Sequence, residues 1–511
     1  MKAIKTLIFT AILAAVTSAA FAQNEVKSHN EEAANLWAEL DEYTQEAWKE
    51  YGEYRDQCNR EFAEYLEQAW GKVSLQPADT MPKMKKIQPQ DFKVEHTTTD
   101  VKIVTDAGFF ANLFSKISRE VFAKPIEEYK EIESLEERDF NFTFLGTDMS
   151  VRVPAKQPKL KSLWEKHIAD LWRTFSKKED YNNMVYDCLK LKEKHNMCDW
   201  AYLKMIQTFA GEWYNNSNEG TLLAAFIYAQ SGYRIKLGAD GTKLYLLYTS
   251  NYSLYESCYY IDDTKYYLAH NSNEGVGINN FLPDNLTVNR GSMKNDTPLS
   301  LSINKNLLLN VSSHEGKNLH GKRFPTVIED VKINQNLVDF YNNYPRGYIG
   351  NSLRSQWVTY ANAPLSKEAS DILYPKLRYT IAGKDTVESL NILLDFVQHA
   401  FTYKVDNDVW GTDRIFFPDE TLTYPYSDCE DRAILFSRIV RDILQLEVVL
   451  IHYPNHLAAA VNINRDDIPG TYVLDQTRTK SYIICDGTYF GASIGEEQPL
   501  LRGAPKVIVE L

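Results

Sequence analysis

The chain has 511 residues, of which 44% are apolar and 24% are charged, so it is long enough for several compact units with ordinary hydrophobic cores. Its formal net charge of −13 repels the phosphate backbone of nucleic acids, and no basic stripe offsets that repulsion. Composition and charge therefore exclude nucleic acid as an expected partner, while an enzyme and a binding protein both remain open.

The first 22 residues are typical of a secretory signal peptide. Lys2 and Lys5 give a basic start, an apolar segment follows over Leu7–Val16, and Ala20-Phe21-Ala22 provides small residues at a cleavage site. The apolar segment is too short to span a bilayer, and no later segment is apolar enough to do so. We therefore expect an exported protein, periplasmic or extracellular, with no transmembrane segment.

Periodicity and turn residues predict a chain of mixed α+β modules. Apolar residues recur every three or four positions over Glu31–Trp70, which predicts a helix. Three prolines within Ser74–Asp91 predict a linker there. The expected organisation is a signal peptide (1–22), an N-terminal helical segment (23–75), a small β-rich module (76–160), a helical plus α/β module (161–270), a β-rich module (271–345) and a C-terminal domain (346–511).

Several local predictions concern the approach to the C-terminal domain. Strands are expected at Ser300–Ile303 and Leu307–Val311, and a helix at Asn334–Tyr344. Another helix is expected near Ser366–Tyr374, stopped by Pro375, because proline lacks the N–H that a helix interior needs.

The segment around Cys429 carries the most chemical information. Asp428 is placed to cap a helix that begins at Cys429, with Asp431 three residues further on, as in a capping box. A sulfur at the first helical position meets unpaired backbone N–H groups and the positive end of the helix dipole, which favour a thiolate. Asp428, Glu430 and Asp431 oppose this effect, so the site needs a cationic partner, for which an imidazolium is the natural candidate.

A histidine and an aspartate complete the expected site. His456 begins an apolar strand after the turn Tyr453-Pro454-Asn455 and is a candidate general base for Cys429. Asp486 ends the apolar run Tyr482–Cys485 and is a candidate for fixing the imidazole tautomer. Two rivals are weaker: His452 lies on the strand before the turn, and Asp475 lies in a hairpin turn.

The order of these motifs resembles the transglutaminase-like superfamily. The resemblance rests on Cys429-Glu430-Asp431-Arg432-Ala433 at a helix start, then the His456 strand, then Asp486-Gly487-Thr488-Tyr489, within about 385–511. It implies a papain-type α+β domain with a helix packed on an antiparallel sheet. It also implies the roles of nucleophile for Cys429, base for His456 and orienting acid for Asp486. The family often has proline where Gly487 stands.

Residues Leu222–Tyr248 show the same order of apolar helix, glycine stop and paired strands as the C-terminal unit. This order suggests a second, degenerate copy of the fold within residues 161–270. Asn215–Gly220 precedes its helix and contains no cysteine, so the copy is not expected to perform cysteine chemistry.

The sequence therefore predicts acyl chemistry at an amide of a peptide or protein through an acyl-thioester on Cys429. Water as acceptor gives a peptidase or amidase and an amine gives an acyltransferase; the triad serves both. The six cysteines show no zinc spacing, and we expect neither a metal nor a cofactor. The alternative is a non-catalytic exported binding or scaffold protein whose triad is a relic.

Overall fold

The computed structural model describes residues 52–81, 86–93, 102–105, 126, 137–270, 282–293, 296–312, 316–350, 354–465, 467–475 and 477–511. The chain divides into two compact units, Met1–Phe62 and Ala63–Leu511. In the first unit the described residues 52–62 are helical, in agreement with the helix expected from the periodicity. The expected signal peptide and the start of that helix lie outside the described residues.

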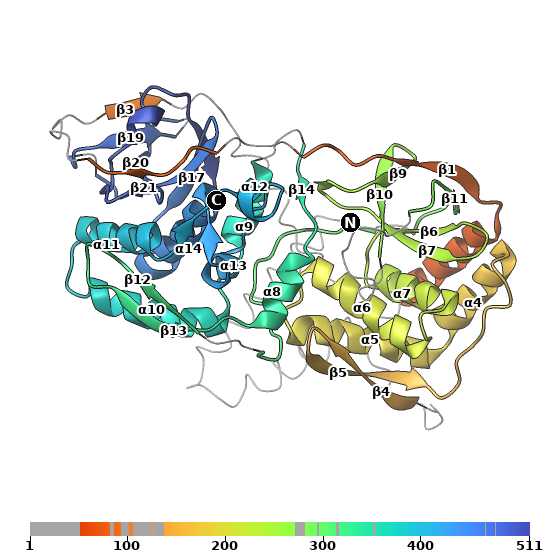
Figure 1. Cartoon of the computed structure of the whole chain (residues 1–511). Coiled ribbons are helices and arrows are strands. Elements are labelled where there is room, and N and C mark those ends of the chain that lie inside the picture. The colour runs from red at the N-terminus through yellow and green to blue at the C-terminus, as the bar shows by residue number, and fades with distance from the viewer. Residues whose placement is uncertain are drawn as a thin grey trace, which may run out of the picture. The chain divides into compact units, whose positions relative to one another are not determined.

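The first half of the second unit combines a helical layer with a closed β-barrel (Figure 1). Helices α6 and α7 are buried along nearly their whole length because they carry apolar residues all around, as expected for helices inside a core. The elements are the helices α4 (Glu165–Lys177), α5 (Glu179–Lys194), α6 (Asp199–Trp213) and α7 (Asn218–Gln230), and the barrel strands β1 (Gly71–Gln76), β6 (Ile235–Ala239), β7 (Leu244–Tyr248), β9 (Cys258–Ile261), β10 (Thr264–Leu268) and β11 (Asn285–Val288). Near them lie the hairpin β4 (Glu137–Phe144) and β5 (Thr147–Pro154), and the short strand β8 (Ser253–Leu254).

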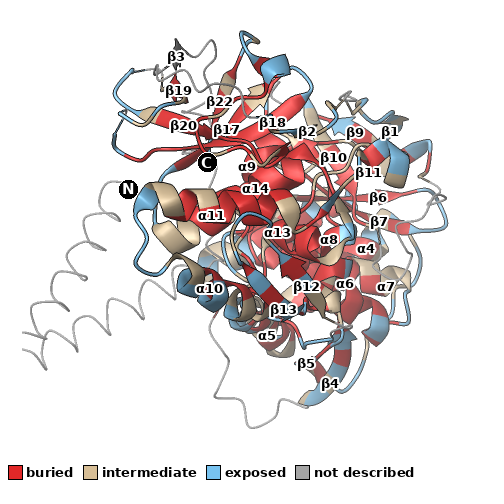
Figure 2. Ribbon diagram, turned by 60° about the vertical axis from the view of Figure 1, so that its left-hand side comes forward, coloured by how far each residue is buried: buried red, intermediate tan, exposed pale blue. Residues whose placement is uncertain are grey.

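The C-terminal half packs helices against a six-stranded sheet. Helix α14 contacts β17 and β18 directly, and all three are largely buried (Figures 1 and 2). Its helices are α9 (Ser355–Asn362), α10 (Lys367–Ile381), α11 (Thr386–His399), α12 (Asp406–Val409), α13 (Pro418–Thr423), α14 (Cys429–Leu444) and the 3₁₀ turn η1 (Pro499–Leu501). Its sheet, in spatial order, is β22 (Val507–Glu510), β17 (Val448–Tyr453), β18 (His456–Val461), β20 (Ser481–Cys485), β19 (Thr471–Leu474) and β3 (Lys102–Thr105).

Short elements connect and flank these layers. They are α8 (Gln335–Asn342) and the paired strands β12 (Lys317–His320) with β13 (Val327–Val331), β14 (Gly347–Tyr348) with β8, β15 (Thr402–Tyr403) with β16 (Tyr426–Ser427), and β2 (Gln90–Asp91) with β21 (Tyr489–Phe490). Helix α8 confirms the helix expected at 334–344. No helix of the described residues combines the length and apolar character needed to cross a membrane.

The two halves share one strand order. In the barrel, five strands follow the order β11-β6-β7-β10-β9, and in the C-terminal sheet five follow β22-β17-β18-β20-β19, with every neighbouring pair antiparallel. In each half a buried helix, α7 or α14, leads into the first hairpin. The sixth strand differs, because β1 joins β9 and β11 to close the barrel, whereas β3 adds parallel to β19 and leaves the sheet open. A second copy of the fold, as suggested for residues 161–270, would show such a shared order, but the fifth strand, β11, lies beyond that range.

Four local predictions were wrong. Residues 300–303 and 307–311 do not form strands. Helix α10 continues through Pro375 to Ile381. Leu373 and Leu377, two residues before and after the proline in the same helix, are fully buried, and their packing outweighs the backbone hydrogen bond that the proline removes. Residues 74–91 are more than a linker, since they include the end of β1, the whole of β2 and a buried lysine, Lys86.

Candidate active site

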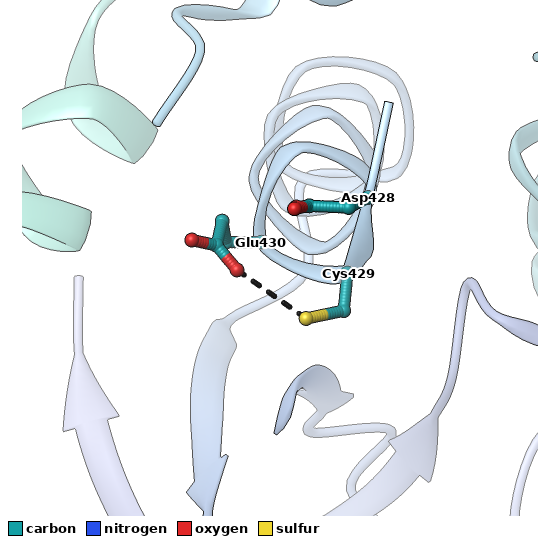
Figure 3. A group of neighbouring side chains, drawn as sticks. All are labelled: Asp428, Cys429 and Glu430. Atoms are coloured by element: carbon teal, nitrogen blue, oxygen red, sulfur yellow. Dashed lines mark hydrogen bonds between the residues drawn. The ribbon is translucent and has the colours of Figure 1, made fainter. Parts of the chain in front are cut away.

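Cys429 occupies the first position of α14, as the sequence predicted. Its backbone follows Asp428 in an extended conformation (φ −118°, ψ −155°), and the Asp431 carboxylate accepts the Asp428 N–H at 3.0 Å, which fixes the start of the helix. The thiol donates a hydrogen bond to Oε2 of Glu430 at 3.3 Å, and Figure 3 shows the Glu430 carboxylate turned toward the sulfur. The sulfur therefore lies at the helix N-terminus but beside a carboxylate.

Burial and charge both favour the neutral thiol. Burial is the largest cause that raises the pKa of Cys429 well above its ordinary value, and the carboxylates of Glu430 and Asp428 raise it further. Lys86 and the backbone N–H of Leu457 act in the opposite direction, because they favour the thiolate. A thiolate thus needs a group that removes the proton at the moment of reaction.

His456 is the first residue of β18, at the end of the hairpin with β17. The two-residue turn Pro454-Asn455 places Asn455 in the left-handed region (φ 64°), which asparagine tolerates better than most residues. The rival His452 lies elsewhere, since Arg354 donates to its Nδ1 at 3.1 Å and the ring packs against Trp357. Burial, followed by the charge of Arg354, lowers the pKa of His452 to about 4.

Asp486 directly follows β20 and pairs with His456. Its Oδ2 lies 2.9 Å from Nε2 of His456 and accepts from Gln498 at 2.7 Å, while its Oδ1 accepts from the backbone and hydroxyl of Thr488 at 2.8 and 2.9 Å. Burial raises the pKa of Asp486, but His456 and the Thr488 bonds lower it by more, so the net pKa lies below its ordinary value. The rival Asp475 caps its exposed hairpin turn by accepting from Thr479 and Lys480.

The structure brings the imidazole and the carboxylate into contact, and the backbone N–H of Leu457, the residue after His456, acts on the Cys429 sulfur. No hydrogen bond joins Cys429 to His456; the Nδ1 of His456 is buried without a partner among the described residues. Since Nε2 faces Asp486, Nδ1 is the nitrogen left to exchange a proton with the thiol.

The cation beside the acidic residues is Lys86, which the sequence analysis missed. Its Nζ lies 2.8 Å from Asp406, 3.0 Å from Asp413 and 2.8 Å from Glu430, and it also contacts Asp428. Its side chain is 2% exposed. Burial lowers the pKa of Lys86, but Glu430 and Asp428 raise it by more, so the side chain remains an ammonium ion. The expected imidazolium partner of these acids is thus replaced by an ammonium group from a distant segment.

Together with Cys429 and Asp431, these four carboxylates form three overlapping groups whose ligand atoms lie within 4.8 Å of one another, as a metal site requires: Asp428, Cys429 and Glu430; Asp406, Asp413 and Glu430; Asp406, Asp428 and Asp431. In this structure the Lys86 ammonium contacts four of these carboxylates. The positive charge that such a cluster needs therefore comes from the chain itself.

Buried polar side chains hold the Asp486 turn. Arg432, fully buried in α14, donates to the carbonyls of Gln398 and Phe401 at 2.9 and 2.8 Å. Gln398 in turn donates to the carbonyls of Asp486 and Tyr489 at 3.0 and 2.8 Å. The sequence predicted no role for Gln398 or Gln498, the two glutamines that hold this turn, because a single glutamine belongs to no recognisable motif.

The corresponding positions of the barrel half carry other residue types. Asn218 takes the first position of α7, where Cys429 stands in α14, and its Oδ1 accepts the N–H of Leu244 at 2.8 Å. Ala269 follows β10 as Asp486 follows β20. Neither the cysteine nor the aspartate of the candidate site therefore has a counterpart at these two positions.

Comparison with known families bears directly on the C-terminal half. A family model described as a transglutaminase-like domain matches residues 373–501, which include Cys429, His456 and Asp486. The same comparisons match the chain to no curated protein and to no solved structure. Residues 373–501 are therefore a transglutaminase-like domain of the transglutaminase-like superfamily.

Proposed function

We propose that this domain is a cysteine enzyme that acts on peptide or protein amides through an acyl-thioester. The observation that carries the proposal is the buried pair His456–Asp486. The Asp486 carboxylate contacts Nε2 of His456 at 2.9 Å, which leaves Nδ1 of the same ring for proton exchange. The backbone N–H of the next residue, Leu457, acts on the Cys429 sulfur.

The reaction has two steps, acylation of Cys429 and deacylation. In the first, Nδ1 of His456 takes the thiol proton, the sulfur of Cys429 bonds to the amide carbon, and the C–N bond breaks as the imidazolium returns the proton to the leaving amine. Backbone N–H groups in the first turn of α14 would stabilise the negative oxygen of the tetrahedral intermediate. In the second, Nδ1 of His456 takes a proton from water or an amine as that acceptor bonds to the thioester carbon, the C–S bond breaks to release the acid or the new amide, and the imidazolium returns the proton to the sulfur.

An exported location remains part of the proposal, and it rests on the signal-like residues 1–22. Export would place peptides, cell-wall stems or host proteins within reach as substrates. The choice between water and an amine as acceptor depends on the groove around the sulfur, because the same triad serves either acceptor.

The test is to trap the intermediate. The protein is incubated with a panel of glutamine-containing and other peptide amides, with and without a fluorescent primary amine. Mass spectrometry then locates acyl groups on the peptide that carries Cys429. We expect an adduct on Cys429, and product formation that is lost in both Cys429→Ala and His456→Ala. Turnover that survives in Cys429→Ala would reject the proposal, and a well-folded protein with no adduct on any substrate would favour the non-catalytic alternative.

A further inference from the structure

The three candidate catalytic residues are almost completely covered. Cys429 and His456 are each 1% exposed and Asp486 is 3% exposed. A peptide amide cannot reach the sulfur while these side chains are covered, because attack requires the carbonyl carbon to lie about 3–3.5 Å from the sulfur. Some part of the chain must therefore move before a substrate binds.

One short segment, residues 86–92, contacts the neighbours of all three candidates. Lys86 contacts Asp428 and Glu430, the residues on either side of Cys429. The N–H of Ile87 donates to the carbonyl of Asn455, which precedes His456, at 3.2 Å. This strap, as we name residues 86–92, thus bridges the flanks of the cysteine and of the histidine.

The strap continues along the aspartate in an extended form. The N–H of Gln90 donates to the carbonyl of Thr488 at 3.4 Å, and the N–H of Phe92 donates to that of Phe490 at 2.7 Å. These bonds make β2 a parallel partner of β21, which follows Asp486 by three residues. Addition of an extended strand to a sheet edge is the way in which many domains bind peptides.

Charge selects what occupies the first position of the strap. Four carboxylates face the Lys86 ammonium: Asp406, Asp413, Asp428 and Glu430. Buried carboxylates without a cation are costly, so a neutral side chain in this place would leave them unpaired. Tyr403 adds a further hold on the strap by donating to the carbonyl of Ile87 at 2.9 Å.

We propose that residues 86–92 occupy, in cis, a groove of the transglutaminase-like domain that binds an extended peptide with a basic side chain beside Cys429, so that the site is closed until the strap leaves. The substrate part of this inference rests on the proposed function, whereas closure by the strap does not. The strap lies outside the residues 373–501 that the family model matches.

The test measures how fast iodoacetamide labels Cys429, read by mass spectrometry of the peptide that contains it. Phe92→Pro removes the N–H bonded to Phe490 and keeps Lys86, and Phe92→Ala is the matched control that loses the same ring but keeps the N–H. We expect Phe92→Pro to be labelled at least about tenfold faster than Phe92→Ala, the population change expected when a hydrogen bond that holds an opening segment is lost.

Equal labelling rates in the two folded proteins would overturn the proposal that the strap closes the site. If Phe92→Pro does not fold, Ile87→Pro compared with Ile87→Ala decides in the same way, because it removes the bond to Asn455. Labelling needs no turnover, so failure of the strap and failure of the proposed enzyme are separate results.

Specificity for a basic side chain is tested in the opened protein. An acetylated peptide with the sequence of residues 86–93 is added to Phe92→Pro, alongside the same peptide with norleucine at the position of Lys86. We expect the lysine peptide to slow labelling of Cys429 and the norleucine peptide to slow it at least about tenfold less efficiently, since it leaves the carboxylates unpaired. Equal protection by both peptides would show that the groove does not select a cation.

Discussion

His456 and Asp486 form a buried contact in which Nε2 and Oδ2 lie 2.9 Å apart, and the carboxylate receives three further hydrogen bonds from Gln498 and Thr488. The contact fixes which imidazole nitrogen is left for the sulfur. It also links the fold to the chemistry, because the residues that hold Asp486 come from α11, α14 and the segment after β21.

Asp486→Asn tests the charge of this carboxylate. The side-chain amide of asparagine has an NH₂ group in place of one carboxylate oxygen, and this NH₂ would face groups that already donate hydrogen bonds. We therefore expect a loss of about 1–3 kcal/mol in the free energy of unfolding at pH 7. The folded pKa of Asp486 is lowered, so its contribution is fully present above the ordinary pKa of about 3.9 and is lost as the pH falls through the lower folded pKa. Urea unfolding at several pH values should show the two proteins converging in acid; a constant difference would contradict this.

Gln498→Leu tests a positioning residue. It removes the 2.7 Å bond to Asp486 but preserves much of the side-chain volume. Because that bond favours the ionised carboxylate, its loss should raise the pKa of Asp486 and move the acid-induced loss of stability to higher pH. A purely structural role would lower stability equally at every pH, which is the result that would refute the assignment.

Lys86→Met tests the ion cluster. Removal of one partner from a buried charge cluster typically costs about 3–5 kcal/mol, so the free energy of unfolding at pH 7 should fall by about that amount. Burial and neighbouring charges raise the pKa of Asp428, and burial raises that of Glu430 despite Lys86, so these groups take up protons more readily as the pH falls. The deficit should therefore shrink in acid. The matched control Lys93→Met, at an exposed position, should change stability by no more than about 0.5 kcal/mol.

Glu430→Gln tests the acid that hydrogen-bonds the thiol at 3.3 Å. Burial is the main cause of the raised pKa of Cys429 and Glu430 is the next, so removal of this negative charge should lower the thiol pKa. The pH at which alkylation of Cys429 reaches half its maximum rate should fall accordingly. Glu388→Gln, on the exposed side of α11, is the control; an unchanged midpoint in Glu430→Gln would show that this charge does not act on the sulfur.

Local sequence patterns foresaw the C-terminal site well. Helix α14 begins at Cys429, β18 begins at His456, and β20 ends at Cys485 just before Asp486, as expected, because capping and apolar runs are local signals. The paired His456 and Asp486 followed from their places at a strand start and a strand end. These two positions became neighbours because β18 and β20 pair directly.

Long-range partners could not be foreseen in this way. Lys86 lies in a proline-containing segment and meets Asp428 across 342 residues of sequence, so nothing near either residue marks the contact. The failure at Pro375 has a similar origin, since the packing of Leu373 and Leu377 decides the course of α10. The shared strand order of the two halves became visible only when the pairing of β9, β10 and β11 was known.

Whether His456 serves the sulfur is decided by the rate at which iodoacetamide alkylates Cys429 in the parent protein and in His456→Ala, measured at the same pH. Both proteins keep residues 86–92 in place, so the ratio of the two rates reports on the imidazole. We expect His456→Ala to react about a hundredfold more slowly, the lower end of what a general base contributes. Equal rates in two folded proteins would contradict the claim that His456 serves the sulfur of Cys429.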